Sequence, residues 1–353
     1  MKYFLPTKIV IGKLEEEIKR ELRRFKPIKI LLVTGGKAME KSGVIGKMLE
    51  LLSDYQILRF NEVESNPSPA TVKKAKKNCD LVIGLGGGSV MDVAKVAATE
   101  LKKPYIAIPT TAGTGSEVTP FAALYDKEKK KKLSLDVNFP DVALIDYRLT
   151  LTMSPGLIAT TGMDALSQAV EAYWSIYSNI WSDFHSERAI RLVMNNLLKS
   201  WRGDQAAKKN MSLAALEAGM AFSQTKTTAP HAVSYPLSIH YGIPHGLACG
   251  LTLPHFLTYN YKVSKKDCLD KRGEDFVKTR IRSIASFLGG TDVEGGKKAI
   301  INLMESLNLP LKVDFDEDIV IKEGFAPERM ANNPRRVTEA GLREILIQIK
   351  KRA

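Results

Sequence analysis

The residues best suited to chemistry lie in the second half of the chain. Asp164 and Gln168 are four residues apart in TGMDALSQAVEAYW, so on a helix they would share one face. Three of the chain's five histidines fall within one short segment: His231, His240 and His245. An aspartate on a helix with two histidines on a later segment can bind a divalent metal, although such an aspartate is often only a helix cap. We expect the other two histidines to be structural: His185 and His255.

In the first half, an apolar run leads into consecutive glycines in GLGGGSVMDVAK, residues 84–95. Glycines let backbone approach a phosphate closely, and the amides at a helix N-terminus favour negative charge. Neither a GxGxxG fingerprint nor a Walker GKS/T motif fits this segment. The segment therefore predicts a different kind of phosphate loop, or a tight turn that binds nothing. The candidate residues are Gly86, Gly87, Gly88 and Ser89.

A second loop of small residues, PTTAGTGSE at 109–117, follows the next apolar run. Two such loops at the carboxyl ends of neighbouring strands would line one crevice, where open α/β sheets bind ligands. Asp92 lies in the first turn of the glycine-loop helix, and capping and cofactor contact are equally open for it. The second loop adds four candidate cofactor-binding residues: Thr110, Thr111, Thr114 and Ser116.

The segments around these motifs predict two domains. Short apolar runs at 28–33, 81–85, 105–108 and 142–145 alternate with helical patterns, which indicates a parallel sheet covered on both faces. From 155 onward the spacing is mostly helical. We therefore expect an α/β domain at 1–152 and a mostly helical domain at 153–353, with a ligand cleft between them.

Composition narrows the class of protein further. The 353 residues are 44% hydrophobic and 26% charged, which excludes a wholly disordered chain. Three cysteines without a CxxC pair fit a reducing compartment, and we expect a cytoplasmic protein with no export signal or membrane span. The net charge of +13 could suit nucleic acid, but no basic segment is interleaved with aromatic residues. The lysine-rich run at 126–133 is typical of a solvated hairpin turn.

Together these motifs resemble the iron-containing, group III alcohol dehydrogenases. The resemblance rests on GGGSxxDxAK, PTTAGTGSE, GMDALxxAxE, two histidines fourteen residues apart with the second in PHG, and NPR at 333–335. It implies a fold like dehydroquinate synthase, with an α/β dinucleotide-binding domain at 1–152 and an all-α metal-binding, catalytic domain at 153–353. It also implies reversible oxidation of an alcohol with NAD(P). Glycerol dehydrogenases and dehydroquinate-synthase-like lyases share the architecture, but the helical motifs favour the iron-containing group.

The resemblance also implies roles for single residues. Asp164, His231 and His245 match three metal ligands, for Fe²⁺ or Zn²⁺. Gln168 stands where the family usually has a fourth, histidine, ligand. Its carbonyl oxygen is a harder and weaker donor, so we expect looser metal binding or a water in the fourth position. Tyr235 replaces a proton-relay histidine. Proton delivery would then use Tyr235, His240 or water.

Cofactor choice depends on the end of the first strand. NAD-preferring relatives carry an aspartate there, and this chain has Gly35, followed by Gly36 and Lys37. A missing carboxylate beside a lysine favours NADPH, with NADH as the alternative.

The segments around the histidines are similar to the phosphonoacetaldehyde reductase branch, which implies a small anionic aldehyde. Lys226 and, second, Arg335 are the candidate contacts for its anionic group. The alternatives are a general primary-alcohol dehydrogenase and a metal-free nucleotide-binding relative. The expected partners are this small substrate and a second copy of the chain, with no nucleic acid or membrane.

Overall fold

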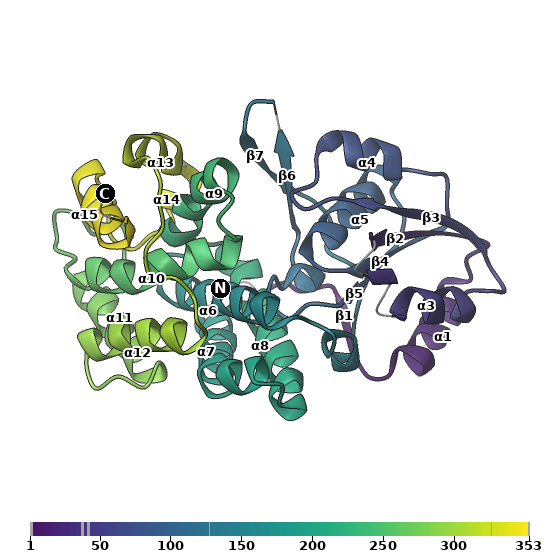
Figure 1. Cartoon of the computed structure of the whole chain (residues 1–353), viewed down its shortest axis with the longest axis horizontal. Coiled ribbons are helices and arrows are strands. Elements are labelled where there is room, and N and C mark those ends of the chain that lie inside the picture. Colours follow the sequence, from purple (N-terminus) through teal and green to yellow (C-terminus); the bar gives the residue numbers. More distant parts are fainter. Residues whose placement is uncertain (1–2, 37–38, 41–42, 127, 326, 352–353) are drawn as a thin grey trace. The chain divides into compact units, whose positions relative to one another are not determined.

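The computed structural model describes residues 3–36, 39–40, 43–126, 128–325 and 327–351, so Lys37 lies outside the described residues. The chain divides into two compact units after Met153; Tyr3 belongs with the second unit. Figure 1 labels the helices and strands of both units and colours them along the sequence.

The first unit is built on a six-stranded parallel sheet of order β1-β8-β5-β4-β2-β3. The four predicted strands are confirmed in it. They are β2 (Lys29–Gly35), β4 (Leu81–Gly86), β5 (Tyr105–Pro109) and β8 (Val142–Ile145), joined by β1 (Lys8–Ile11) and β3 (Gln56–Val63).

Both faces of this sheet are covered, which explains the unbroken apolar runs. In β2, Leu31 and Val33 pack toward α4 and α5, whereas Ile30 and Leu32 pack toward α1 and α3. The predicted hairpin is an antiparallel pair of strands, β6 and β7, whose inner residues join the core on the α5 side. The elements are α1 (Leu14–Phe25), α3 (Val44–Leu51), α4 (Pro69–Ala75), α5 (Gly88–Leu101), β6 (Phe121–Asp126) and β7 (Lys131–Asp136), with short 3-10 turns at Ser116–Val118 and Tyr147–Thr150.

The second unit is helical among its described residues, as the resemblance implied. Its long helices follow the predicted periodic segments: α6 (Pro155–Trp174), α7 (Ile180–Trp201), α8 (Gln205–Thr225), α11 (Glu274–Phe287) and α12 (Val293–Ser306). The others are α9 (Ala229–Tyr241), α10 (His245–Tyr261), α13 (Glu317–Gly324), α14 (Pro327–Met330) and α15 (Glu339–Ile349). Among the described helices, none combines the length and apolar character of a transmembrane span.

Helix α6 is the central element of this unit and contacts α7, α8 and α10. Ser154 caps its N-terminus by accepting a hydrogen bond from the Leu157 amide, and Pro155 occupies the first turn, where its missing N–H costs nothing. Most of the helix is buried, including the polar residues Asp164, Gln168 and Glu171. Buried polar groups need partners, so this helix marks the candidate site.

The start of α10 approaches α6 so closely that only glycine fits at Gly246, and Gly250, one turn later, also lies in close contact with α6. A Cβ added at Gly246 would overlap the carbonyl group of Thr160 and lie 3.0 Å from Asp164 Cβ, and one at Gly250 would lie 3.0 Å from Met163 Cε. The approach places His245 and Cys249, which precede these glycines, beside α6.

Gly246→Ala should therefore lower the free energy of unfolding by about 1–3 kcal/mol, the usual cost of overpacking. Gly156→Ala is the matched control, because no atom lies within 4 Å of its added Cβ; it should be neutral or stabilising by up to about 1 kcal/mol. Thermal and urea unfolding of both variants measure this. Equal stability of the two would contradict the close helix contact.

Candidate metal centre and cofactor loops

Three helices of the second unit carry the candidate residues in pairs one turn apart, and each helix contributes at least one side chain to a single cluster. These pairs are Asp164 and Gln168 on α6, His231 and Tyr235 on α9, and His245 and Cys249 on α10. The one-turn spacing directs both members of each pair to the same side of their helix.

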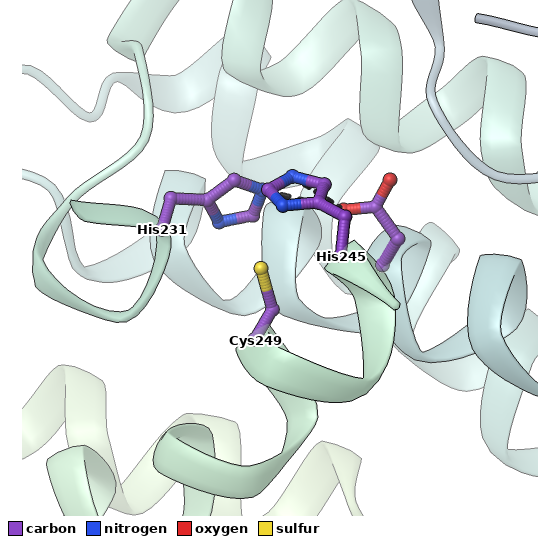
Figure 2. A group of neighbouring side chains, drawn as sticks. His231, His245 and Cys249 are labelled. Atoms are coloured by element: carbon purple, nitrogen blue, oxygen red, sulfur yellow. Dashed lines mark ion pairs between the residues drawn. The ribbon is translucent and has the colours of Figure 1, made fainter. Parts of the chain in front are cut away.

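Asp164 lies between the two imidazole rings. Its Oδ1 is 3.3 Å from His231 Nε2 and 3.8 Å from His245 Nε2, and this buried oxygen accepts no hydrogen bond. The Cys249 sulfur completes a group whose ligand atoms all lie within 4.8 Å of one another. Figure 2 shows the two rings together with the Cys249 sulfur pointing toward them.

This donor set fits a divalent metal ion. Ligand atoms at tetrahedral angles, with metal bonds of about 2.0–2.1 Å, lie about 3.3 Å apart, close to the two distances from Asp164. An acid, two imidazoles and a sulfur are also ligands that Zn²⁺ and related ions accept.

Glu171 orients His231 from behind. It is fully buried on α6, and its Oε1 lies 2.5 Å from His231 Nδ1, while its Oε2 accepts from the Thr228 amide at 2.6 Å and hydroxyl at 3.0 Å. With Nδ1–H donated to Glu171, the Nε2 lone pair faces Asp164, as in carboxylate–histidine–metal arrangements. Sequence analysis missed this role, although Glu171 ends the GMDALxxAxE motif.

His245 is oriented in a similar way. The Ser234 hydroxyl donates to the His231 carbonyl at 2.7 Å and lies 3.2 Å from His245 Nδ1, which can donate to it. The Tyr235 ring stacks on the His245 ring with centroids 5.6 Å apart. Both histidines therefore present Nε2 to Asp164.

Burial and neighbouring charge act in opposite directions here. Burial lowers the pKa of His231, but Cys249 and Glu171 raise it, and the result lies well above its ordinary value. Burial raises the pKa of the Cys249 thiol. The negative charge that favours a bound cation lies on the two carboxylates beside His231, those of Glu171 and Asp164.

The structure does not bring every candidate into this cluster. His240 lies nine residues after His231 on α9, about half a turn around the helix, and its Nε2 is 2.7 Å from Glu323 Oε2. Arg335 forms an ion pair with Asp267 at 2.7 Å and donates to the Tyr259 carbonyl, which gives it a structural role in place of the expected anion contact.

The two remaining histidines lie outside the cluster. His185 is 2.6 Å from Glu217, and burial lowers the pKa of His255 to about 4.

Gln168 is buried on α6, one turn after Asp164.

In the first unit, the two predicted loops lie against each other. An added Cβ at Gly87 would lie 3.2 Å from Thr111, and one at Gly88 would lie 2.7 Å from Thr114. The Thr110 amide donates to the Gly86 carbonyl at 2.9 Å. Ser89 lies in the first turn of α5, so exposed amides and small side chains meet there. Gly35 ends β2, and Gly36 follows it.

A buried charged network braces the second loop. Asp92 accepts from the Ser116 hydroxyl at 2.9 Å and the Ala123 amide at 3.0 Å, and Lys95 donates to Ser116 at 2.9 Å. These contacts give Asp92 and Ser116 a clear role in holding the loop. Burial lowers the pKa of Lys95 to about 8 and raises that of Glu117 to about 7. The sequence motif contained Lys95 and Glu117, but neither was predicted as a functional residue.

Comparison with known proteins gives the family. A family model described as iron-containing alcohol dehydrogenase matches residues 6–147, and the C-terminal model of the Fe-containing alcohol dehydrogenase family matches residues 158–349. The chain belongs to the iron-containing alcohol dehydrogenase family, as the sequence motifs indicated, and it is an alcohol dehydrogenase.

Individual relatives span most of the chain. The NADPH-dependent butanol dehydrogenase of Clostridium saccharobutylicum is 31% identical over 98% of this chain and 97% of its own length. The phosphonoacetaldehyde reductase of Streptomyces viridochromogenes is 33% identical, covering 76% and 75%. The sulfoacetaldehyde reductase of Bifidobacterium kashiwanohense, solved with NAD⁺, is 30% identical with a TM-score of 0.88, covering 99% and 98%.

Glu171→Gln should weaken Zn²⁺ binding about 10- to 100-fold, the usual effect of removing a carboxylate behind a metal-binding histidine. Competition with a chromophoric chelator measures the affinity. Glu187→Gln, on the exposed side of α7, is the control. Unchanged affinity in the Glu171 variant would exclude the orienting role.

Glu117 should make stability depend on pH. Burial raises its pKa in the folded state to about 7, above the ordinary value of 4.5. The folded state therefore binds the proton more tightly, and stability falls as pH rises between these values. The loss is at most about 3 kcal/mol, at 1.36 kcal/mol per pKa unit. Glu117→Gln should remove it, whereas Glu62→Gln on the surface should not. Urea unfolding at pH 5 and pH 8 measures this, and identical pH dependence in wild type and Glu117→Gln would refute it.

Proposed function

We propose that this alcohol dehydrogenase reduces a small anionic aldehyde with NADPH at a divalent metal held by Asp164, His231 and His245. The observation that carries the proposal is the buried Asp164 oxygen, which faces the Nε2 atoms of both histidines and accepts no hydrogen bond. A buried carboxylate needs hydrogen bonds or opposite charge to compensate it, and a divalent cation bound by Asp164 and the two histidines would supply that charge.

The metal, when bound, acts as a Lewis acid on the aldehyde oxygen, where negative charge develops as hydride is added. The chain's own residues prepare this chemistry. Glu171 and Ser234 fix the two histidine rings, and the ring of Tyr235 covers one face of His245. Tyr235 is the proposed proton donor, because it is the hydroxyl-bearing ring that stacks on a metal-binding histidine.

The glycine loop and the 109–117 loop of the first unit are the proposed site for the cofactor pyrophosphate, since an N-terminal helix turn and small residues meet there. NADPH is the proposed donor because β2 ends in Gly35, without the carboxylate that would repel a 2′-phosphate. One relative's name specifies NADPH and one solved neighbour carries NAD⁺, so both cofactors belong in the test.

Two cations are candidates for binding the anionic group of the substrate. The Arg329 guanidinium lies 4.7 Å from the centroid of the Tyr235 ring, which in turn stacks on His245. The positive charge of Arg329 is therefore separated from His245, a ligand of the proposed metal, by the Tyr235 ring alone. Lys226, the residue predicted from the sequence, is exposed and lies next to Thr227, the hydrogen-bond partner of Arg329. The names of two relatives, reductases of phosphonoacetaldehyde and sulfoacetaldehyde, support an anionic aldehyde.

The protein reconstituted with Fe²⁺ or Zn²⁺ should oxidise NADPH faster with phosphonoacetaldehyde than with propionaldehyde, and chelation should abolish both activities. Absorbance of the reduced cofactor measures turnover, with NADH run in parallel. Equal kcat/KM for the two aldehydes would instead indicate a general primary-alcohol dehydrogenase, which the butanol dehydrogenase relative favours. Turnover that survives chelation would exclude the metal.

Arg329→Met and Lys226→Met test the two cations. Loss of a charge-assisted contact costs about 1.5–3 kcal/mol, so whichever variant removes the anchor should lower kcat/KM for the anionic aldehyde about 10- to 100-fold and leave propionaldehyde unaffected. Arg202→Met, at an exposed position after α7, is the control. Equal losses for both aldehydes in a variant would assign that residue a structural role.

A further inference from the structure

Cys249 lies where a fourth ligand would be needed. The position four residues after Asp164, where the family usually has histidine, is Gln168 in this chain. Cys249 is fully buried, and its sulfur belongs to the same group of atoms as Asp164 Oδ1 and the two imidazoles. In Figure 2 the sulfur points from α10 toward both rings.

We infer that Cys249 supplies a thiolate ligand to the metal, so that the protein ligands are one carboxylate, two imidazoles and one sulfur. The inference rests on the metal site of the proposed function. Binding would break the S–H bond, release the proton to solvent and form a metal–sulfur bond, as metal binding to thiols does. The substrate oxygen would then join as a further ligand, which zinc sites accommodate by expanding their coordination.

Helix packing prepares Cys249 for this role. It follows His245 by one turn of α10, so both residues face the cluster. The same face carries Gly246 and Gly250, whose missing side chains let α10 approach α6. Asp164, only 4% exposed, faces the same cluster from α6, and its Oδ1 accepts no hydrogen bond and lies near both histidine Nε2 atoms.

The chemistry also favours sulfur over the amide of Gln168. A thiolate is charged and soft and selects zinc, whereas an amide oxygen is a neutral, hard donor that suits magnesium or calcium. The other two thiols are elsewhere: Cys79 is in the core of the first unit, and Cys268 contacts the Asp270 carbonyl. With Cys249 as a ligand, Asp164, His231 and His245 bind a metal such as zinc without a third imidazole.

Cobalt substitution of the full-length protein tests the inference, because thiolate-bound Co²⁺ absorbs strongly in the near ultraviolet. Chelator-treated protein is titrated with Co²⁺. We expect one equivalent to produce this band together with the visible bands of the ion. Cys249→Ser should abolish the near-ultraviolet band and weaken Zn²⁺ binding at least about 10-fold, as even loss of a residue behind a ligand does. Cys268→Ser, the matched control, should keep the band.

A second measurement needs no variant. Zinc-edge X-ray absorption of the wild-type protein should detect one sulfur neighbour at about 2.3 Å. Cobalt or zinc bound without a sulfur signal, or a band that persists in Cys249→Ser, would overturn the thiolate ligand and leave the metal-dependent function standing. Failure of the wild-type protein to bind either ion would overturn both.

Discussion

The burial of two carboxylates on α6 is the constraint on which the second unit depends. An ionised carboxylate removed from water is stable only when hydrogen bonds or opposite charge compensate it. Glu171 is compensated within the protein, by the Thr228 amide and hydroxyl and the His231 ring. Asp164 Oδ1 has no such donors and faces two imidazole nitrogens. Glu171 therefore orients the residues of the site, whereas Asp164 is available to bind a cation.

This constraint explains the helix packing around α6. The Glu171 contacts hold the start of α9, and the glycines of α10 let its first two turns approach the same helix. Small residues are needed because any side chain at Gly246 would occupy the space of the Thr160 carbonyl. The PHG motif thus combines a ligand with the glycine that lets it approach Asp164. The site is carried by helices packed against a rigid core, which favours precise geometry.

The fold was predictable wherever burial leaves a clear periodic pattern. Strands β4 and β8 are buried throughout, so each appears in the sequence as a continuous apolar run. Helix α6 is long and begins with a capping serine followed by a proline, so its sequence also identified it. Strands β1 and β3 were not predicted. β1 has only four residues, and both strands are half-exposed and lack a continuous apolar run. The clustering of histidines downstream of Asp164 identified the region of the site, and the family resemblance selected Asp164, His231 and His245, which the structure brings together. The sequence could not identify Cys249 as a member of this group, because the contact between α10 and α6 is a property of packing. The one available signal was its spacing of four residues from His245.

Ligand charge connects the metal centre to substrate choice. With Asp164 and a Cys249 thiolate as ligands, a divalent ion is neutralised, whereas a carboxylate with three imidazoles would leave a net charge of +1. A neutral centre attracts an anionic aldehyde less through long-range Coulomb forces. Recognition of the anionic group must then come from fixed side-chain cations, and Arg329 is held near the centre by its stacking on Tyr235. Under the proposed function, a Cys249 thiolate in place of a third imidazole and the Arg329 guanidinium beside Tyr235 would act together in specificity for an anionic aldehyde.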